Sequence, residues 1–169
     1  GRLVQQKDQI TLLRSLNLIK DKIKFKALII GSGDKKNSLK DYIKDNKLNN
    51  FVKIINFKKN PYNYLKKADL VVHTAIYEGL PNVLLEAICL NKFVISTNCS
   101  TGPSEILSNG KGGDLINLKD YKTLSKKIIE FYFNKKQFDK KKKFALKQLT
   151  RFDYKKNLTQ YLIEVKKLM

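Results

Sequence analysis

Residues 78–88 read EGLPNVLLEAI, a turn followed by the start of a helix. The fixed φ of Pro81 suits the first turn of a helix, where its missing N–H would have had no partner. The amides that follow, of Asn82, Val83 and Leu84, are then expected to point out of the helix start without partners. Such an end carries about half a positive charge and readily binds phosphate.

Two carboxylates flank this helix start, because Glu78 and Glu86 bracket the same stretch. Glu86 lies four residues after Asn82, so both side chains project from one face of the helix. Glu78 precedes the turn and lies on the other side of the expected phosphate position. A site with amides in the middle and a hydroxyl-accepting carboxylate at each end has the layout of a nucleotide sugar, which consists of ribose, diphosphate and sugar.

Outside this stretch, apolar runs typical of strands alternate with helical patterns. This alternation predicts an α/β domain with a single doubly wound parallel sheet, covered by helices on both faces. The expected strands are the end of a first strand at Leu3 and Val4, a fully buried strand at 25–30, and further strands at 52–57, 70–73, 93–96 and 114–117. The last part of the chain is expected to form helices at 120–134, 137–149 and 154–168.

Two early helices show the clearest buried stripes. Asp8 is expected to cap the first of them, and the apolar spacing predicts which side chains face inward. For the first helix these are Ile10, Leu13, Leu16 and Ile19 (or Leu12), and for the second Leu39, Ile43 and Leu48. Ligands of such sheets bind beyond the carboxyl ends of the strands, an edge where we expect Arg2, Gly31, Phe57, Thr74 and Thr97.

The stretch 78–88 resembles the E-x7-E signature of retaining GT-B glycosyltransferases of group 1, also called family 4, which build bacterial polysaccharides. Four other stretches resemble motifs of this family in the same order: residues 1–7 (GRLVQQK) its basic motif, 27–33 (ALIIGSG) its second strand and glycine turn, 68–72 (ADLVV) a later strand, and 101–106 (TGPSEI) a loop and short helix. The resemblance covers about residues 1–125.

The order of predicted elements indicates one Rossmann-like domain over the whole chain, 1–169, with a helical C-terminal tail over about 135–169, and the resemblance agrees with this fold. The resemblance implies the C-terminal, donor-binding half of a GT-B enzyme, with the N-terminal acceptor-binding domain absent from this sequence. Because the reaction takes place between the two halves, the chain is expected to be inactive by itself.

The resemblance also assigns roles to individual residues. Glu78 is expected to contact hydroxyls of the donor sugar, and Glu86 those of the ribose. Arg2 and Lys7 are expected to neutralise the leaving diphosphate, for which arginine offers a bidentate contact and lysine a point contact. Ordinary surface charges remain the alternative for all four.

Further donor-binding positions follow from the same comparison. Gly79 is expected to allow close approach of the backbone to the donor, and the amides of Leu80, Asn82 and Val83 are expected to contact it. The turn at Gly31 is expected to border the nucleotide, and Phe57 and Lys58 to lie at the edge that recognises the base. Thr101 and Gly102 are expected to line the cleft near the phosphate. A purely structural turn remains the alternative for Gly31, whose G-S-G run lacks the third glycine of a dinucleotide fingerprint, and for Gly79.

Metal and redox chemistry are not expected. The sequence has no acidic D-x-D pair and no His/Cys ligand cluster, so the domain is predicted to need no metal and no cofactor. His73, the one histidine of the chain, is assigned a structural role. Cys89 and Cys99 are expected to be reduced and buried.

The expected donor is UDP linked to a hexose or N-acetylhexosamine, transferred with retention to a glycan or lipid-linked acceptor. A net charge of +20, nearly all from lysine, suits peripheral contact with an anionic membrane from the cytoplasmic side; the alternative is that it reflects the lysine-rich usage of an AT-rich genome. The lysine run at 135–143 is expected to be a solvated helix face. The alternatives are a UDP-sugar epimerase and a basic polyanion-binding module, the latter disfavoured because no nucleic-acid motif is present.

Overall fold

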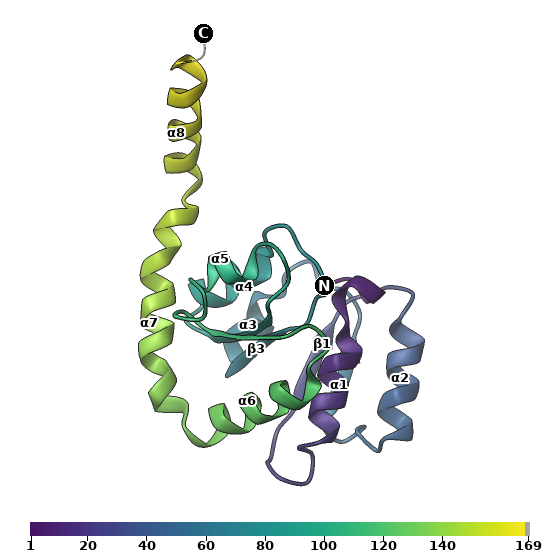
Figure 1. Cartoon of the computed structure of the whole chain (residues 1–169). Helices are drawn as coiled ribbons and strands as arrows, with labels where there is room; N and C mark the ends of the chain where they lie inside the picture. The colour runs from purple at the N-terminus through teal and green to yellow at the C-terminus, as the bar shows by residue number, and fades with distance from the viewer. Residues whose placement is uncertain (168–169) are drawn as a thin grey trace.

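A computed structural model describes residues 1–167 of the chain (Figure 1). Its strands are β1 (Ala27–Ile30), β2 (Val52–Ile55), β3 (Leu70–His73), β4 (Phe93–Thr97) and β5 (Asp114–Ile116). Its α-helices are α1 (Gln9–Asn17), α2 (Lys36–Asp45), α3 (Tyr62–Lys67), α4 (Asn82–Cys89), α5 (Pro103–Ile106), α6 (Tyr121–Phe133), α7 (Asp139–Gln148) and α8 (Tyr154–Lys167). Three 3₁₀ turns complete the order: η1 (Gln5–Lys7), η2 (Lys135–Phe138) and η3 (Leu149–Phe152).

All strand pairs are parallel, as the alternating sequence predicted. They form two sheets, however: β1 pairs with β2, and β3, β4 and β5 follow one another in a second sheet. The prediction of a single sheet is therefore wrong for the described part of the chain, because no ladder joins β1 to β3 there.

The predicted first strand at Leu3 and Val4 is also not a strand. The amino group of Gly1 donates to the Ile30 carbonyl at 2.7 Å, and the Leu3 amide donates to the Ser32 carbonyl at 2.9 Å. These bonds align the first residues with the end of β1, but the chain turns into η1 directly afterwards. The Lys35 amide also donates to the Leu3 carbonyl at 2.9 Å, so isolated bonds fix the segment without forming a ladder. The Leu3 side chain is buried.

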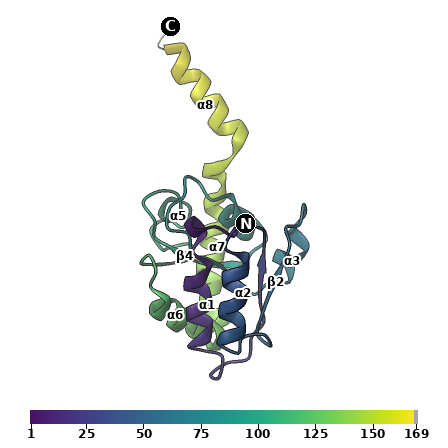
Figure 2. The same ribbon diagram turned by 90° about the vertical axis from the view of Figure 1, so that its right-hand side faces the viewer.

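Helices cover both faces of the larger sheet, which confirms the doubly wound arrangement. Successive side chains of a strand point to opposite faces, and β4 shows this directly. Phe93 and Ile95 join the cluster that α1, α2 and α6 build, whereas Val94 joins the cluster of α4, α5 and α7. Figure 2 shows α1 and α2 side by side.

The predicted inward residues of α1 and α2 are mostly confirmed. The buried ones are Leu13, Leu16, Ile19, Leu39, Ile43 and Leu48, while Ile10 and Leu12 are half-buried. The strand at β1 is not fully buried, contrary to expectation, because Leu28 is 42% exposed whereas Ile29 is buried. Only one face of β1 is covered, so an apolar run there does not imply burial on both sides.

Asp8 occupies the residue before α1 but does not cap it through its side chain. Its carboxylate accepts a hydrogen bond from the Thr11 hydroxyl at 2.7 Å, and no helix amide donates to that carboxylate. The backbone at Asp8 is left-handed, with φ of 44° and ψ of 45°, unlike the extended conformation of an ordinary N-cap. Asp120 does act as a cap: it accepts a bond from the Thr123 amide at 2.9 Å at the start of α6.

Replacing Asp120 by alanine is expected to lower the free energy of unfolding by about 1 kcal/mol, or the melting temperature by about 2–4 °C. The hydrogen bonds of Thr123 lower the pKa of Asp120. The stability that Asp120 contributes is therefore fully present above the pKa that Asp120 has in the unfolded chain. It is lost as the pH falls through the lower pKa that Asp120 has in the folded chain. Thermal unfolding at neutral pH and at acid pH measures both effects, with Asp41→Ala on the exposed side of α2 as the control. Equal melting temperatures for the two variants at neutral pH would contradict the capping role.

The predicted helical C-terminal tail is confirmed within the described residues, and its first part, residues 135–152, packs against the body of the domain. The Phe138 ring lies 4.5 Å from that of Phe93 and 5.5 Å from that of Phe131, and Ala145 of α7 is buried. Lys141 pairs with the buried carboxylate of Asp114, so the lysine run is not purely solvated.

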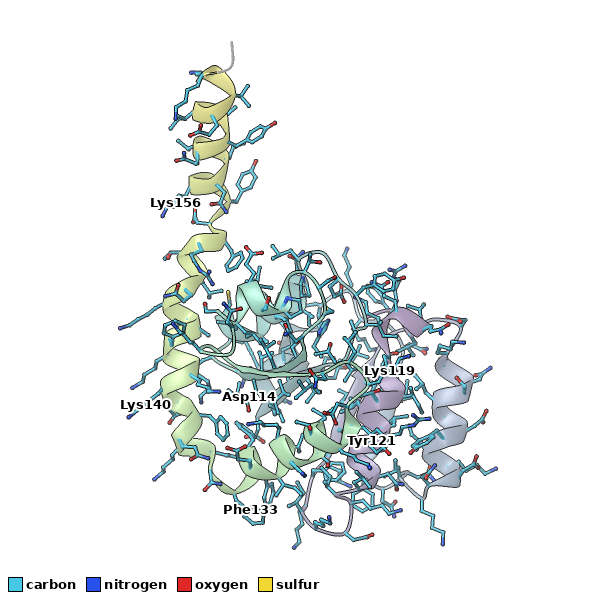
Figure 3. All side chains as sticks on the ribbon, in the orientation of Figure 1. Asp114, Lys119, Tyr121, Phe133, Lys140 and Lys156 are labelled. Carbon is cyan, nitrogen blue, oxygen red and sulfur yellow. The ribbon has the colours of Figure 1, made fainter. Side chains whose placement is uncertain are left out.

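Only α8 projects from the body (Figure 1), and none of its residues is buried. Lys140 of α7 and Lys156 of α8 both extend away from the domain (Figure 3). The predicted helix over 154–168 is confirmed through Lys167, and its last residue lies outside the described part. None of the helices within residues 1–167 is long and apolar enough to cross a membrane.

Candidate functional site

The turn η1 lies against the loop that follows β3. The Ile76 amide donates to the Gln6 carbonyl at 2.8 Å, and the Thr74 hydroxyl donates to the Lys7 carbonyl at 3.0 Å. The side-chain amide of Gln6 also donates to the Tyr77 carbonyl at 2.9 Å. These contacts bring the basic residues at the start of the chain to Glu78, which is 71 positions away from Lys7 in sequence.

Glu78 is held by two side chains on one oxygen atom. The ammonium group of Lys7 forms an ion pair with Oε1, and Nε2 of His73 lies 3.1 Å from the same atom. Only 10% of the Glu78 side chain is exposed. Burial by itself raises the pKa of Glu78, but the hydrogen bonds from Lys7 and His73 outweigh it, and the pKa lies below its ordinary value. Glu78 is therefore a carboxylate at neutral pH.

The start of α4 differs in detail from the expectation. The helix begins at Asn82, and Pro81 precedes it in an extended conformation, with ψ of 95°. The Leu84 amide is not free, because it donates to the Pro81 carbonyl at 2.9 Å. Within residues 1–167, no backbone carbonyl accepts from the amides of Asn82 and Val83, and both residues are exposed. The helix start therefore offers the free amides of Asn82 and Val83, one fewer than predicted, and both residues are accessible to solvent.

Thr101 and Gly102 support the turn before α4 from the other side. The Thr101 hydroxyl donates to the Glu78 carbonyl. Gly102 has φ of +86°, and a Cβ atom there would lie 2.1 Å from the Gly79 carbonyl oxygen and 2.6 Å from Cδ of Pro81. A Cβ on Gly79, in contrast, would meet nothing within 4 Å. Of Gly79 and Gly102, it is therefore Gly102 that requires glycine for close packing.

Glu86 lines a surface cavity of about 400 Å³ between α3 and α4. The other lining residues are Tyr62, Asn82, Leu85, Cys89 and Leu90. Cys89 is exposed, contrary to expectation, whereas Cys99 is buried as predicted; both are free thiols. Sequence reasoning did not single out Tyr62, although its place after β2, just beyond Pro61, puts it on the ligand-binding edge of a parallel sheet.

The glycine turn after β1 is shaped by packing. A Cβ on Gly31 would lie 1.8 Å from the Gly1 carbonyl oxygen, so no side chain fits there. The Phe57 amide donates to the Ser32 hydroxyl at 3.4 Å, which places the loops after β1 and β2 next to each other. Phe57 and Lys58 are exposed, and no hydrogen bond or ion pair within the described residues joins them to Glu78.

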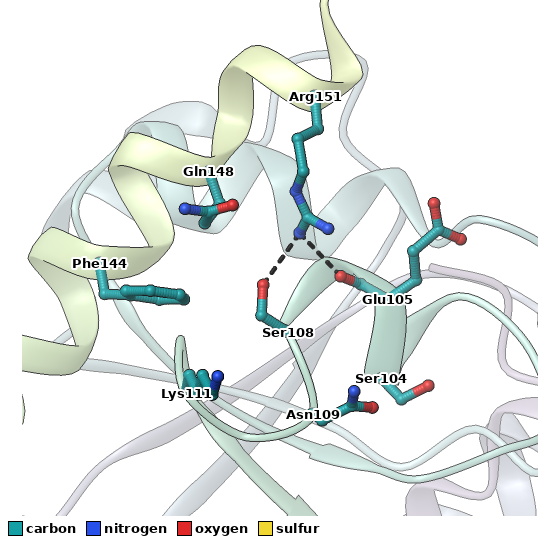
Figure 4. Close-up of a pocket in the computed structure, with 8 residues that line it drawn as sticks. All are labelled: Ser104, Glu105, Ser108, Asn109, Lys111, Phe144, Gln148 and Arg151. Carbon is teal, nitrogen blue, oxygen red and sulfur yellow. Dashed lines mark hydrogen bonds between the residues drawn. The ribbon is translucent and has the colours of Figure 1, made fainter.

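A larger cavity of about 480 Å³ lies between α5 and the segment from α7 to η3 (Figure 4). Arg151 donates to the Glu105 carbonyl at 2.9 Å and to the Ser108 hydroxyl at 3.0 Å. None of the residues predicted for donor binding lines this cavity. The hydrogen bonds of Arg151 hold η3 against the end of α5, so Arg151 has a structural role there.

Arg2 remains close to η1 and exposed, with one of its guanidinium nitrogens 3.3 Å from Oε1 of Gln6. Across residues 1–167, no three His, Cys, Asp or Glu side chains come together in a way that could hold a metal ion. The expectation that binding is independent of metal stays a prediction.

Comparison with known proteins identifies relatives. A family model described as "Glycosyl transferases group 1" matches residues 1–148. A protein of Methanocaldococcus jannaschii named as an uncharacterized glycosyltransferase is 44% identical over 108 residues, which are 63% of this chain and 27% of that protein. An enzyme of Campylobacter jejuni named as a 4-alpha-N-acetylgalactosaminyltransferase acting on a diphospho-undecaprenol-linked sugar is 26% identical over 166 residues, which are 96% of this chain and 45% of that protein.

Solved structures share the fold. The crystal structure of HepE from Anabaena in complex with UDP superposes with a TM-score of 0.88 at 23% identity, over 100% of this chain and 47% of that one. The chain thus spans less than half the length of these relatives.

Proposed function

Because this chain belongs to the group 1 glycosyl transferases, we propose that it is the donor-binding domain of a retaining enzyme and binds UDP linked to a hexose or N-acetylhexosamine. One observation carries the proposal. The largely buried carboxylate of Glu78, with 10% of its side chain exposed, is held by Lys7 next to the open start of α4, and Glu86 projects from that same helix. The relatives support the donor class, since one is named for N-acetylgalactosamine transfer and another was solved with UDP.

The diphosphate is assigned to the start of α4. The free amides of Asn82 and Val83, joined by the Leu80 amide in the preceding turn, offer donors in the direction that the helix dipole favours for an anion. An ammonium group has three N–H donors. Lys7 directs one of them to Glu78, which leaves two for phosphate oxygens. Arg2 is exposed near the same turn and supplies a second cation.

The remaining parts of the donor extend to either side. Glu78 accepts hydrogen bonds from hydroxyls of the sugar, and Glu86 accepts them from the ribose. The base lies toward the loops after β1 and β2, where Gly31, Phe57 and Lys58 contribute backbone groups. Thr101 and Gly102 fix the turn between the sugar and the diphosphate.

In this arrangement the bond between the anomeric carbon and the diphosphate oxygen breaks, and an acceptor hydroxyl oxygen takes its place with retention. The leaving diphosphate gains negative charge in the transition state. Lys7, Arg2 and the amides of α4 stabilise that charge more than they stabilise the ground state, which accelerates the reaction. These fixed positive groups take the part of a metal ion.

A second domain is proposed to bind the acceptor, a glycan or a lipid-linked oligosaccharide of cell-surface polysaccharide synthesis. Support comes from the relatives, which are more than twice as long as the matched part. The net charge of +20 suits work at the anionic cytoplasmic face of a membrane.

Calorimetric titration of the chain with UDP in EDTA is the direct test. We expect a dissociation constant of about 1 mM or tighter and competition by UDP-glucose or UDP-N-acetylglucosamine. No heat and no competition at millimolar UDP would contradict the proposal. Binding of RNA with a steep salt dependence and no affinity for UDP would favour the polyanion-binding alternative instead.

A further inference from the structure

His73 lies directly beneath the carboxylate of Glu78. It ends β3 and is only 8% exposed. Its Nε2 atom is 3.1 Å from Oε1 of Glu78, and its Nδ1 atom is 2.9 Å from the hydroxyl oxygen of Ser96. Ser96 is the register partner of His73 on β4 and is fully buried. Two backbone-fixed strands therefore determine where both ring nitrogens point.

The protons available to these groups decide the state of the ring. A carboxylate has no proton to donate, and a neutral imidazole has one N–H. With that proton on Nδ1, the bare Nε2 atom would face the Glu78 oxygen, and two lone pairs would oppose each other in a buried place. With the proton on Nε2, the ring donates to Glu78, and the single hydroxyl proton of Ser96 is free to be donated to Nδ1. Only this second arrangement supplies a proton to both close contacts.

Burial, more than the charges that face the ring, keeps the His73 imidazole neutral at ordinary pH. Burial lowers the pKa of His73, the nearby Glu78 carboxylate raises it, and the Lys7 ammonium lowers it again, with a net decrease. On protonation in acid, Nδ1 would donate to the Ser96 oxygen, and the hydroxyl proton would turn to the Thr97 carbonyl, 3.0 Å away. The bond from Nε2 to Glu78 is kept in both charge states, because Ser96 can either donate or accept.

We infer that His73 is a positioning residue for Glu78: as the Nε2–H tautomer it holds Oε1 together with Lys7, so that Oε2 faces the hydroxyls of the donor sugar. Among the described residues, the hydrogen bonds to this carboxylate all reach Oε1. The inference rests on the proposed function for the identity of the ligand, whereas the contacts of His73 with Glu78 and Ser96 do not depend on that function. It replaces the purely structural role that the sequence suggested for His73.

The first test needs no ligand. The chain has a single histidine, so a two-dimensional ¹⁵N–¹H NMR spectrum of the imidazole contains one ring system without overlap. At neutral pH we expect the Nε2 resonance of a protonated nitrogen and the Nδ1 resonance of an unprotonated one. An Nδ1–H tautomer at that pH would overturn the inference.

The second test separates positioning from mere packing. His73→Leu removes the N–H and puts an apolar side chain of similar bulk in its place. His73→Gln restores an N–H donor at about the distance of Nε2 from the backbone. Each variant is titrated with UDP and with the UDP-sugar that wild type binds most tightly, and the readout is the ratio of the two dissociation constants.

For His73→Leu we expect the affinity for the UDP-sugar relative to UDP to fall by about three- to tenfold, with the affinity for UDP itself within about twofold of wild type. His73→Gln is expected to recover most of the lost ratio. If His73→Leu lowered the affinities for UDP and for the UDP-sugar equally, the ratio of the two dissociation constants would be unchanged. That result would show that the ring only fills space. If wild type binds neither ligand, the proposed function fails and the role of His73 toward the sugar fails with it, whereas the tautomer is still decided by the spectrum.

Discussion

Alanine in place of Gly102 is expected to lower the free energy of unfolding by roughly 2–4 kcal/mol and the melting temperature by about 4–15 °C. The backbone at Gly102 is in a region that side chains rarely tolerate, with φ of +86°. The added methyl group would also lie 2.1 Å from the Gly79 carbonyl oxygen, which cannot yield without moving the turn before α4. The variant should therefore lose UDP affinity together with stability.

Gly79→Ala is the matched control for this effect, because Gly79 lies in the turn against which Gly102 packs and has open space around its own Cβ position. Thermal unfolding of both variants, followed by circular dichroism, makes the comparison. We expect Gly79→Ala to stay within about 1 kcal/mol of wild type. Similar melting temperatures for the two variants would mean that the close packing of Gly102 against the 78–81 turn is not formed.

The second large effect concerns ligand affinity without loss of stability. Glu86→Ala is expected to weaken UDP binding by about tenfold to a hundredfold, the equivalent of one charged hydrogen bond of about 1.5–3 kcal/mol. Glu86 is half-buried at the edge of a cavity and makes no ion pair within the described residues. Its removal should leave the melting temperature nearly unchanged, because no packing or pairing is lost.

Glu130→Ala provides the control for charge, since Glu130 is an exposed carboxylate on α6 that bonds Lys127 at 3.2 Å. Its UDP affinity should stay within about twofold of wild type. The same calorimetric titration compares Glu86→Ala with His73→Leu, which should retain UDP binding. If His73→Leu weakened UDP as much as Glu86→Ala does, the assignment of Glu86 to the ribose would be wrong.

Much of this architecture could be predicted from local patterns. Strand and helix positions came close to the observed ones because buried side chains such as Leu39, Ile43 and Phe93 follow the periods of helix and strand. The turn and helix around Glu78 and Glu86 were found for the same reason, since their spacing is local. The predictions that failed depend on which elements pack against a given strand. Leu28, for example, was expected to be buried but is exposed, because one face of β1 is not covered.

The contacts of the site itself were harder to foresee. Lys7 meets Glu78 because η1 docks on the loop after β3, and no local sequence pattern indicates a contact between residues 71 positions apart. His73 was set aside as a structural residue, because a lone histidine at a strand end has no sequence signal for a partner. Its alignment opposite Ser96 becomes visible only when β3 and β4 pair. Local periodicity specifies elements, whereas side-chain partners depend on how those elements pack.

The exposed thiol of Cys89 gives the cavity beside Glu86 a practical use. The second cysteine, Cys99, is buried and the burial raises its pKa, so a maleimide dye would modify Cys89 selectively in the unaltered sequence. The fluorophore would then lie at the rim of the proposed nucleotide site, about one helical turn from Glu86. Occupancy could be followed optically there, with no engineered reporter.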